Sequence, residues 1–97
     1  MSYGIVLVFE GVTEDQYWAV NDKLGIKRDG TGNWPAGMVS HAGGPTASGG
    51  WFVSEVWNSK GDQESFMSSR LGQALGEVGL PQPSQVIDSE LVNFHKE

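Results

Sequence analysis

The run Tyr3–Phe9 (YGIVLVF) constrains the fold more than any other part of the sequence. It is short, rich in β-branched residues and followed by Glu10-Gly11, a pattern that predicts a β-strand. One face of this strand carries Tyr3, Ile5, Leu7 and Phe9, and the other carries Val6 and Val8. An antiparallel sheet with one face in water alternates apolar with polar residues instead. We therefore expect the sheet that contains this strand to be covered on both faces.

Two segments have the apolar spacing of amphipathic helices. Thr13 and Gln16 have capping-box spacing, and apolar residues then recur at helical steps up to Gly25, which predicts a helix over about 13–24. The second helix is predicted over about 62–78, because an apolar stripe there stops at Gly79. That stripe consists of Phe66, Met67, Leu71, Ala74, Leu75 and Val78. Each helix is expected to bury one face against a sheet.

Three more strands complete the pattern. Gly37–Ala42 and Trp51–Trp57 flank the turn sequence GGPTASGG, with a pairing register that the sequence leaves ambiguous by one residue, and Gln85–Phe94 is the last strand. This order predicts an α+β, ferredoxin-like βαββαβ sandwich, in which an antiparallel four-stranded sheet carries two helices on one face. We expect one domain over residues 1–97. Because the helices cover only one face, we also expect a homodimer that buries the other.

The composition excludes several kinds of site and partner. The chain has no cysteine, which removes disulfides, zinc ribbons, iron–sulfur ligation and thiolate catalysis, and fits a cytoplasmic location. The net charge is -6 and the basic residues form no stripe, so nucleic acid is not an expected partner. The apolar run Ile5–Phe9 is too short for a membrane span and lacks the flanks of a signal peptide. We expect no membrane, metal or cofactor partner.

The segment 25–35 (GIKRDGTGNWP) is a long connection between the first helix and the second strand. It contains three glycines and a proline, has no periodic apolar anchor, and exceeds the usual connection length of about 4–6 residues. We expect it to be the most mobile internal segment and to border any pocket, with Trp34 holding its end in place.

The sequences GMVSHAGGPT and GGWFVSEVWNS, followed by a helix that carries Phe66, form a familiar combination. This region resembles the dimeric α+β barrel proteins, the group that includes the antibiotic-biosynthesis-type monooxygenases. The resemblance covers nearly the whole chain in the order of its elements, and its most specific piece is Glu55–Ser59. It implies a homodimer whose two sheets pack face to face into a barrel.

The resemblance implies several activities and does not choose among them. Members of the group include cofactor-independent quinone-forming oxygenases, haem-degrading enzymes, cyclases, isomerases and proteins with no assigned reaction. Trp57 stands at a position that resembles a pocket tryptophan of the oxygenase and haem-degrading branches. The haem-degrading relatives use a histidine on the second helix and an asparagine on the first strand. Here the predicted second helix contains no histidine and the predicted first strand contains no asparagine, which disfavours haem degradation by that scheme.

His41 and Glu55 are the candidate catalytic residues. His41 is the only histidine in the body of the predicted fold, and an unperturbed imidazole, with a pKa near 6.5, exchanges protons at neutral pH. Glu55 lies mid-strand among apolar residues, where a carboxylate is unusual unless it is paired or faces a cavity. One hairpin register pairs the two side chains, and the neighbouring register separates them onto opposite faces. Structural roles for both therefore stay open, and His95 is expected to be solvated.

Aromatic residues are the candidate substrate-binding residues. Trp57, Trp51, Trp34 and Tyr17 could wall a flat pocket, although in a small domain such residues also fill the core or a dimer contact. On the last strand, Asp88 and Glu90 share a face, where they are expected to protect an edge from further pairing.

Two classes of function remain open. In the first, a cofactor-independent monooxygenase, cyclase or isomerase uses His41 as the acid/base group on an aromatic or polyketide-like substrate. In the second, a non-catalytic dimer binds a small hydrophobic ligand or another protein. A cavity that contains His41 with a hydrogen-bonded partner favours the first class, and solid packing around His41 favours the second.

Overall fold

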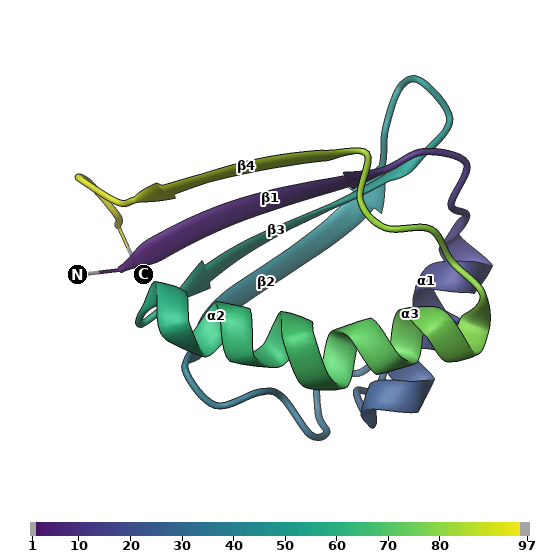
Figure 1. Ribbon diagram of the computed structural model, residues 1–97, viewed down its shortest axis with the longest axis horizontal. Helices are drawn as coiled ribbons and strands as arrows, with labels where there is room; N and C mark the ends of the chain where they lie inside the picture. The colour runs from purple at the N-terminus through teal and green to yellow at the C-terminus, as the bar shows by residue number, and fades with distance from the viewer. Residues whose placement is uncertain (1, 96–97) are drawn as a thin grey trace.

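The computed structural model describes residues 2–95 and contains a four-stranded antiparallel sheet with the helices packed on one face (Figure 1). The elements in chain order are β1 (Tyr3–Phe9), α1 (Glu14–Leu24), β2 (Met38–Pro45), β3 (Trp51–Trp57), α2 (Lys60–Phe66), the π-helical turn η1 (Met67–Leu71), α3 (Gly72–Val78) and β4 (Gln85–Glu90). The strand order across the sheet is β2-β3-β1-β4. This is the predicted ferredoxin-like α+β fold.

The ends of α1 follow directly from the sequence. The Thr13 hydroxyl accepts a hydrogen bond from the Gln16 backbone N–H, and the Gln16 side chain accepts one from the Thr13 N–H, which completes the capping box. Gly25 ends the helix with a φ of 77°, a left-handed conformation that glycine adopts without steric cost. The prediction of a helix here is confirmed.

The second helical region runs without a break from α2 through η1 to the end of α3. It begins before the predicted residue 62 because Ser59 caps it, accepting a hydrogen bond from the Asp62 N–H. The π-helical turn between α2 and α3 is a local widening of the helix, a feature that is rare and often lies near functional sites. Phe66, Ala74 and Leu75 are buried, so the predicted apolar stripe faces the sheet.

The hairpin of β2 and β3 differs from the prediction in length. β2 extends to Pro45, three residues beyond the predicted end, because Gly43 and Gly44 pair with β3 instead of belonging to the turn. The Thr46 hydroxyl accepts a hydrogen bond from the Gly50 N–H and closes the shorter turn. The pairing register also shifts within β2: Met38 lies opposite Trp57, whereas Ser40 lies opposite Val56. Val39 is therefore an extra residue in β2, as in a β-bulge.

The last strand is shorter than predicted. β4 ends at Glu90, whereas the apolar alternation of the sequence continues to Phe94. After Glu90 the Leu91 N–H donates to the Ser2 carbonyl, and the Leu91 side chain packs over Gly4 of β1, where an added Cβ would lie 2.7 Å from the Leu91 Cδ2 atom. Beyond that contact, Val92 and Phe94 are exposed.

The two faces of the sheet have different surroundings (Figure 1). The inner face carries the buried residues of β1 and β3 and packs against the helices. The outer face is also apolar and carries Val6, Val8, Phe52, Val56 and Ile87. Among the described residues no helix covers this face, and Ile87 is 56% exposed. Within residues 2–95, no helix has the length and hydrophobicity that a membrane span requires.

Candidate functional site

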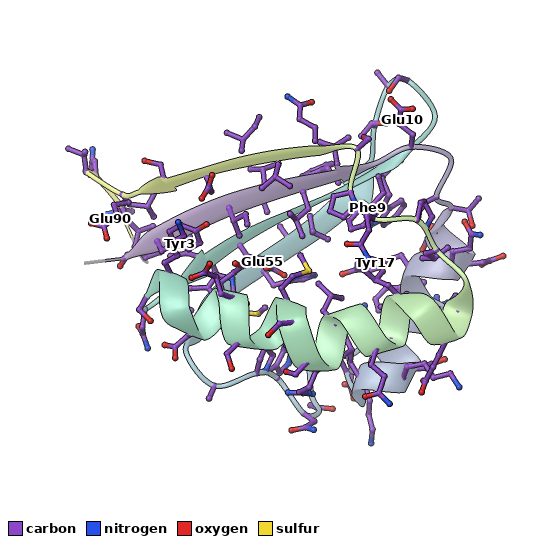
Figure 2. The ribbon with its side chains drawn as sticks, viewed as in Figure 1. Tyr3, Phe9, Glu10, Tyr17, Glu55 and Glu90 are labelled. Atoms are coloured by element: carbon purple, nitrogen blue, oxygen red, sulfur yellow. The ribbon has the colours of Figure 1, made fainter. Side chains whose placement is uncertain are left out.

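His41 is at the centre of a chain of hydrogen bonds that links α1 to β3. Its Nε2 atom is 2.6 Å from the Tyr17 hydroxyl, and its Nδ1 atom is 2.9 Å from Glu55 Oε2. The other carboxylate oxygen of Glu55 accepts a hydrogen bond of 3.1 Å from the Trp57 indole N–H. In Figure 2, Tyr17 and Glu55 lie between the sheet and the helices. The structure therefore brings both candidate catalytic residues together on the inner face.

The register shift in β2 is what positions His41. Continuing a regular ladder from the Met38–Trp57 pair would put Ser40 opposite Glu55 and His41 on the outer face. The extra residue at Val39 moves the ladder by one step, so His41 lies directly opposite Glu55. Of the two registers that the sequence leaves open, the structure has the one that pairs the imidazole with the carboxylate.

The partners of the imidazole assign its protons. An ionised carboxylate only accepts hydrogen bonds, so Nδ1 of His41 carries the proton that is donated to Glu55. In the neutral ring Nε2 is then an acceptor, and the Tyr17 O–H donates to it. Glu55 is 5% exposed, so its charge is stabilised by the His41 and Trp57 donors and not by bulk water. This arrangement orients the ring and stabilises the imidazolium that forms on proton uptake.

Tyr17 stays a proton donor at neutral pH. Burial raises the pKa of its hydroxyl above the ordinary value, a hydrogen bond with Asn21 acts in the opposite direction, and the nearby Glu55 carboxylate adds to the rise. Asn21 is a buried polar residue one helical turn after Tyr17. Sequence reasoning missed Asn21, although its i+4 spacing from Tyr17 on the same helix face was a usable signal.

A mainly apolar cavity of about 50 Å³ borders this chain of hydrogen bonds. His41, Tyr17, Glu55, Asn21 and Trp51 contribute to its lining, together with apolar residues of both helical regions and the inner sheet face. No group of three or more His, Asp or Glu side chains in residues 2–95 is arranged to hold a metal ion. The polar side chains in the lining, which include His41, Tyr17 and Glu55, can form hydrogen bonds and transfer protons.

A second, larger space lies outside the cavity along β2. This groove has a volume of about 350 Å³ and is lined by Trp34, Met38, Val39, Ser40 and His41. Three of these residues, Trp34, Met38 and His41, also line the inner cavity. The imidazole of His41 thus lies between the interior and a space that is large enough for an aromatic ring.

Trp57, a candidate substrate-binding residue, lies in the core of the domain. The sequence predicts this residue in the pocket wall with His41, but its side chain is fully buried and is not part of the cavity lining. Its ring packs against Phe66, with centroids 5.5 Å apart, and its N–H is used by Glu55. Trp57 therefore orients the Glu55 carboxylate by a hydrogen bond from outside the cavity lining.

Trp51, Trp34 and Tyr17, the other aromatic candidates, line the cavity, and their use in substrate binding stays a prediction. The Trp51 ring packs against Tyr17, with centroids 5.0 Å apart, and the Trp34 ring lies 5.5 Å from the His41 ring. Trp34 is 36% exposed and donates its N–H to the Gly30 carbonyl. Because Trp34 lines both the cavity and the groove, it lies at the boundary between them.

The connection 25–35 borders the cavity, but it has an apolar anchor that the sequence analysis did not recognise. Ile26 is buried, lines the cavity and forms a bridge with Gly32. The Arg70 guanidinium also donates to the carbonyl groups of Leu24 and Asn33 at the two ends of the segment. Greater mobility of this segment than of the rest of the chain stays a prediction.

The remaining polar candidates lie elsewhere. Asp88 and Glu90 are exposed on the edge strand β4, as predicted, and Asp88 also accepts a hydrogen bond of 2.5 Å from the Tyr3 hydroxyl. Burial and this hydrogen bond to a carboxylate raise the pKa of Tyr3. His95 is exposed, as predicted.

Comparison with known proteins gives structural matches only. No family model matches the sequence, and no curated protein is significantly similar to it. A candidate antibiotic biosynthesis monooxygenase from Chloroflexus aurantiacus has a TM-score of 0.66 and 16% identity, over 99% of this chain and 98% of that chain. SnoaB, a cofactor-independent oxygenase from Streptomyces nogalater, has a TM-score of 0.65 and 9% identity, over 99% and 98%.

A dimeric ferredoxin-like protein of unknown function from Jannaschia sp. CCS1 has a TM-score of 0.58 and 16% identity, over 93% of this chain and 98% of that chain. This chain has the fold of these proteins. The resemblance noted in the sequence is therefore confirmed at the level of the fold, and the comparison leaves the reaction to be argued from the site.

Proposed function

We propose that this chain forms a homodimeric, cofactor-independent enzyme that removes a proton from a small aromatic or polyketide-like molecule, with His41 as the base. The observation that carries the proposal is the hydrogen-bonded series Tyr17, His41 and Glu55 at the wall of the cavity. A lone structural histidine on a strand needs neither a buried carboxylate partner nor contact with a cavity.

The chemistry follows from the partners of His41. Proton uptake at Nε2 converts the ring to an imidazolium, and the negative charge of Glu55 at 2.9 Å from Nδ1 stabilises that ion. A positioned base of this kind typically accelerates a reaction by about 10²–10⁴. The deprotonated substrate is an electron-rich carbanion or enolate. The likeness in fold to SnoaB, a cofactor-independent oxygenase, supports reaction of that anion with O₂.

We assign different parts of the substrate to the cavity and to the groove, both of which His41 lines. The cavity has a volume of about 50 Å³, which is enough for one polar group or a few water molecules. One water molecule needs about 10–15 Å³ of such volume. The groove of about 350 Å³ is large enough for a ring. In our proposal the ring lies in the groove against Trp34 and Met38, and the acidic group reaches past His41 into the cavity.

The outer face of the sheet supports the homodimer. It is apolar and open, and a second copy would cover it in an interface of roughly 1,500 Å² or more. The Jannaschia protein of the same fold is described as dimeric, which supports the same assembly here. Light scattering is expected to give twice the chain mass at micromolar concentration, and a monomer would contradict this part of the proposal. A single domain over 1–97 and a cytoplasmic location belong to the same proposal.

The catalytic part is tested with anthrone, an enolisable tricyclic ketone whose oxidation to anthraquinone is followed by absorbance. The wild-type protein is expected to accelerate this oxidation, and His41→Gln should lose at least about 100-fold because the base is removed. The matched control is His95→Gln, since His95 is an exposed histidine away from the cavity. Equal rates for wild type and His41→Gln, or no acceleration by the wild type, would contradict catalysis by His41.

A second candidate function is supported by one specific contact. The Nε2 atom of His41 accepts the Tyr17 O–H, so the lone pair that would take up a substrate proton is already engaged in a hydrogen bond. A non-catalytic dimer that binds a small hydrophobic ligand would use the same residues for recognition alone. It predicts saturable binding of anthrone with no His41-dependent oxidation.

A further inference from the structure

The indole N–H of Trp51 has no hydrogen-bond partner among the described residues. Trp51 is 7% exposed and lines the cavity, and its Nε1 atom is buried from solvent. A buried donor without an acceptor costs free energy, which native proteins seldom leave uncompensated. A ligand atom that accepts this hydrogen bond would remove the cost.

The Trp51 donor lies close to the Tyr17 hydroxyl, and both lie beside Gly43 of β2. A Cβ atom added to Gly43 would be 3.3 Å from Trp51 Nε1 and 3.2 Å from Tyr17 Oη. Any larger residue at position 43 would push into the space that these two polar atoms share. The absence of a side chain at position 43 leaves the space beside both atoms free of a Cβ group.

The hydrogen-bond roles of the two atoms are complementary. Tyr17 uses its proton on His41 Nε2, so its oxygen can only accept further hydrogen bonds, from Asn21 and from one more donor. Trp51 can only donate. A ligand group that contacts both atoms must therefore donate one hydrogen bond and accept another, which a hydroxyl does and a carbonyl or ether oxygen does not.

We propose that the cavity recognises an acidic hydroxyl group, that of a phenol or an enol, which donates to Tyr17 Oη and accepts from the Trp51 N–H. This inference rests on the proposed function and names its substrate class. It also makes Trp51 a specificity-determining residue, in a role distinct from that of the base His41.

The proton balance of such a complex is complete without any further reagent. The ligand O–H proton moves to Tyr17 Oη while the Tyr17 proton moves to His41 Nε2. The O–H bond of the ligand breaks, Tyr17 ends as a neutral phenol, and His41 becomes an imidazolium paired with Glu55. The ligand is left as a phenolate or enolate, whose oxygen keeps the hydrogen bond from Trp51.

The experiment compares 1-naphthol with naphthalene, which share a ring system and differ in one hydroxyl. Binding is measured by calorimetry on the wild-type protein, Trp51→Phe and the control Trp18→Phe. Trp51→Phe removes the indole N–H and keeps an aromatic ring. Trp18→Phe makes the same chemical change at a residue that donates to Glu14 and is not part of the cavity lining.

The wild type is expected to prefer 1-naphthol, and Trp51→Phe should reduce this preference by about threefold to tenfold, the worth of one neutral hydrogen bond. Trp18→Phe should leave the preference unchanged. Gly43→Ala, which narrows the space beside both atoms, should weaken 1-naphthol binding without removing any donor. A wild type that binds neither probe or shows no preference, or a Trp51→Phe variant with the wild-type preference, would overturn the inference.

A separate measurement distinguishes this inference from the proposed function. The absorption of bound naphtholate reports proton transfer, and His41→Gln should abolish that signal while leaving the preference for 1-naphthol over naphthalene. A preference that depends on Trp51, with no naphtholate in the wild type, would keep the recognition of a hydroxyl and refute the base. Naphtholate formation that depends on His41, with no effect of Trp51→Phe on the preference, would keep His41 as the base and refute the recognition of a hydroxyl by Trp51.

Discussion

The two edges of the sheet each join a tyrosine to a charged or titratable side chain, but in different surroundings. At the β2 edge, Tyr17 donates to His41, which is held by the buried Glu55 beside a cavity. At the β4 edge, Tyr3 donates directly to Asp88, which lies on a strand whose residues are all exposed. Figure 2 shows Tyr3 and Tyr17 at well-separated positions along the sheet.

The difference shows what an acid–base site requires beyond a tyrosine and a carboxylate. Burial and the Asp88 carboxylate raise the pKa of the Tyr3 hydroxyl above its ordinary value, so Tyr3 stays protonated at neutral pH and its hydrogen bond to Asp88 ties β1 to β4. An imidazole between the two groups adds a side chain that accepts a proton at one nitrogen while it donates from the other. Burying the carboxylate then makes the imidazole its principal partner instead of water.

The largest difference between the edges is expected when each carboxylate is removed. Glu55→Ala should lower the free energy of unfolding by about 3 kcal/mol, because the buried donors of His41 and Trp57 lose their acceptor. Asp88→Ala should cost below about 1 kcal/mol, since water replaces an exposed acceptor. Urea denaturation measures both values. Equal losses at the two positions would remove the distinction between a buried and a solvated pair.

The next effect concerns the outer face at the β4 edge. Ile87 and Val86 are adjacent and similarly exposed, at 56% and 50%, but they point to opposite faces of the sheet. Ile87→Asp should weaken the proposed dimer by about 100-fold, because it buries a charge in the interface, whereas Val86→Asp should have a much smaller effect. Analytical ultracentrifugation gives the dissociation constants. Similar weakening by both variants would show that the outer face is not the interface.

A smaller effect is expected at alkaline pH, where the two tyrosines ionise. Folding raises the pKa of both hydroxyl groups, chiefly by burial, and Asp88 adds to the rise at Tyr3. The unfolded chain therefore loses these protons first, near pH 10, and stability is full below that pH and falls above it. Urea midpoints of wild type, Tyr3→Phe and Tyr17→Phe between pH 8 and 11 measure the slope. Each variant should fall less steeply than wild type, and an unchanged slope would contradict the assignment for that tyrosine.

The smallest effect is expected in the segment 25–35. Trp34→Phe removes one hydrogen bond to the Gly30 carbonyl at a partly exposed site and should cost about 0.5 kcal/mol or less. Amide exchange should be slow at Lys27 and Asn33, which donate to Thr31 and Gly25, even if the rest of the segment exchanges fast. Fast exchange at both of these amides would show that the contacts of Ile26 do not hold the segment in place.

Much of the fold could be predicted because its signals are local. The capping box of Thr13 and Gln16 fixed one helix start, and the apolar residues on both sides of β1 indicated an outer face that no helix covers. The end of β4 could not be predicted, since the apolar alternation of the sequence continues beyond Glu90.

The site was predictable in its residue types and not in its geometry. His41 and Glu55 were named as candidates from their chemistry, but their pairing depends on the register shift between Met38 and Ser40, for which the sequence carries no marker. The two tryptophans of β3 differ in the residues that contact their rings and in the partner of their N–H groups, and the sequence does not show either. Trp57 lies under Phe66 and turns its N–H to Glu55, while the N–H of Trp51 remains unpaired beside Gly43.

Val39 gives this protein a place where chain length can vary without loss of the acid–base pair. Deleting Val39 would turn β2 into a regular ladder and still leave His41 opposite Glu55, whereas a deletion between Ser40 and Pro45 would break the pairing or the turn. Val39 is also one of the residues that line the outer groove. Removal of this one residue would thus reshape the outer groove and preserve the pairing of His41 with Glu55.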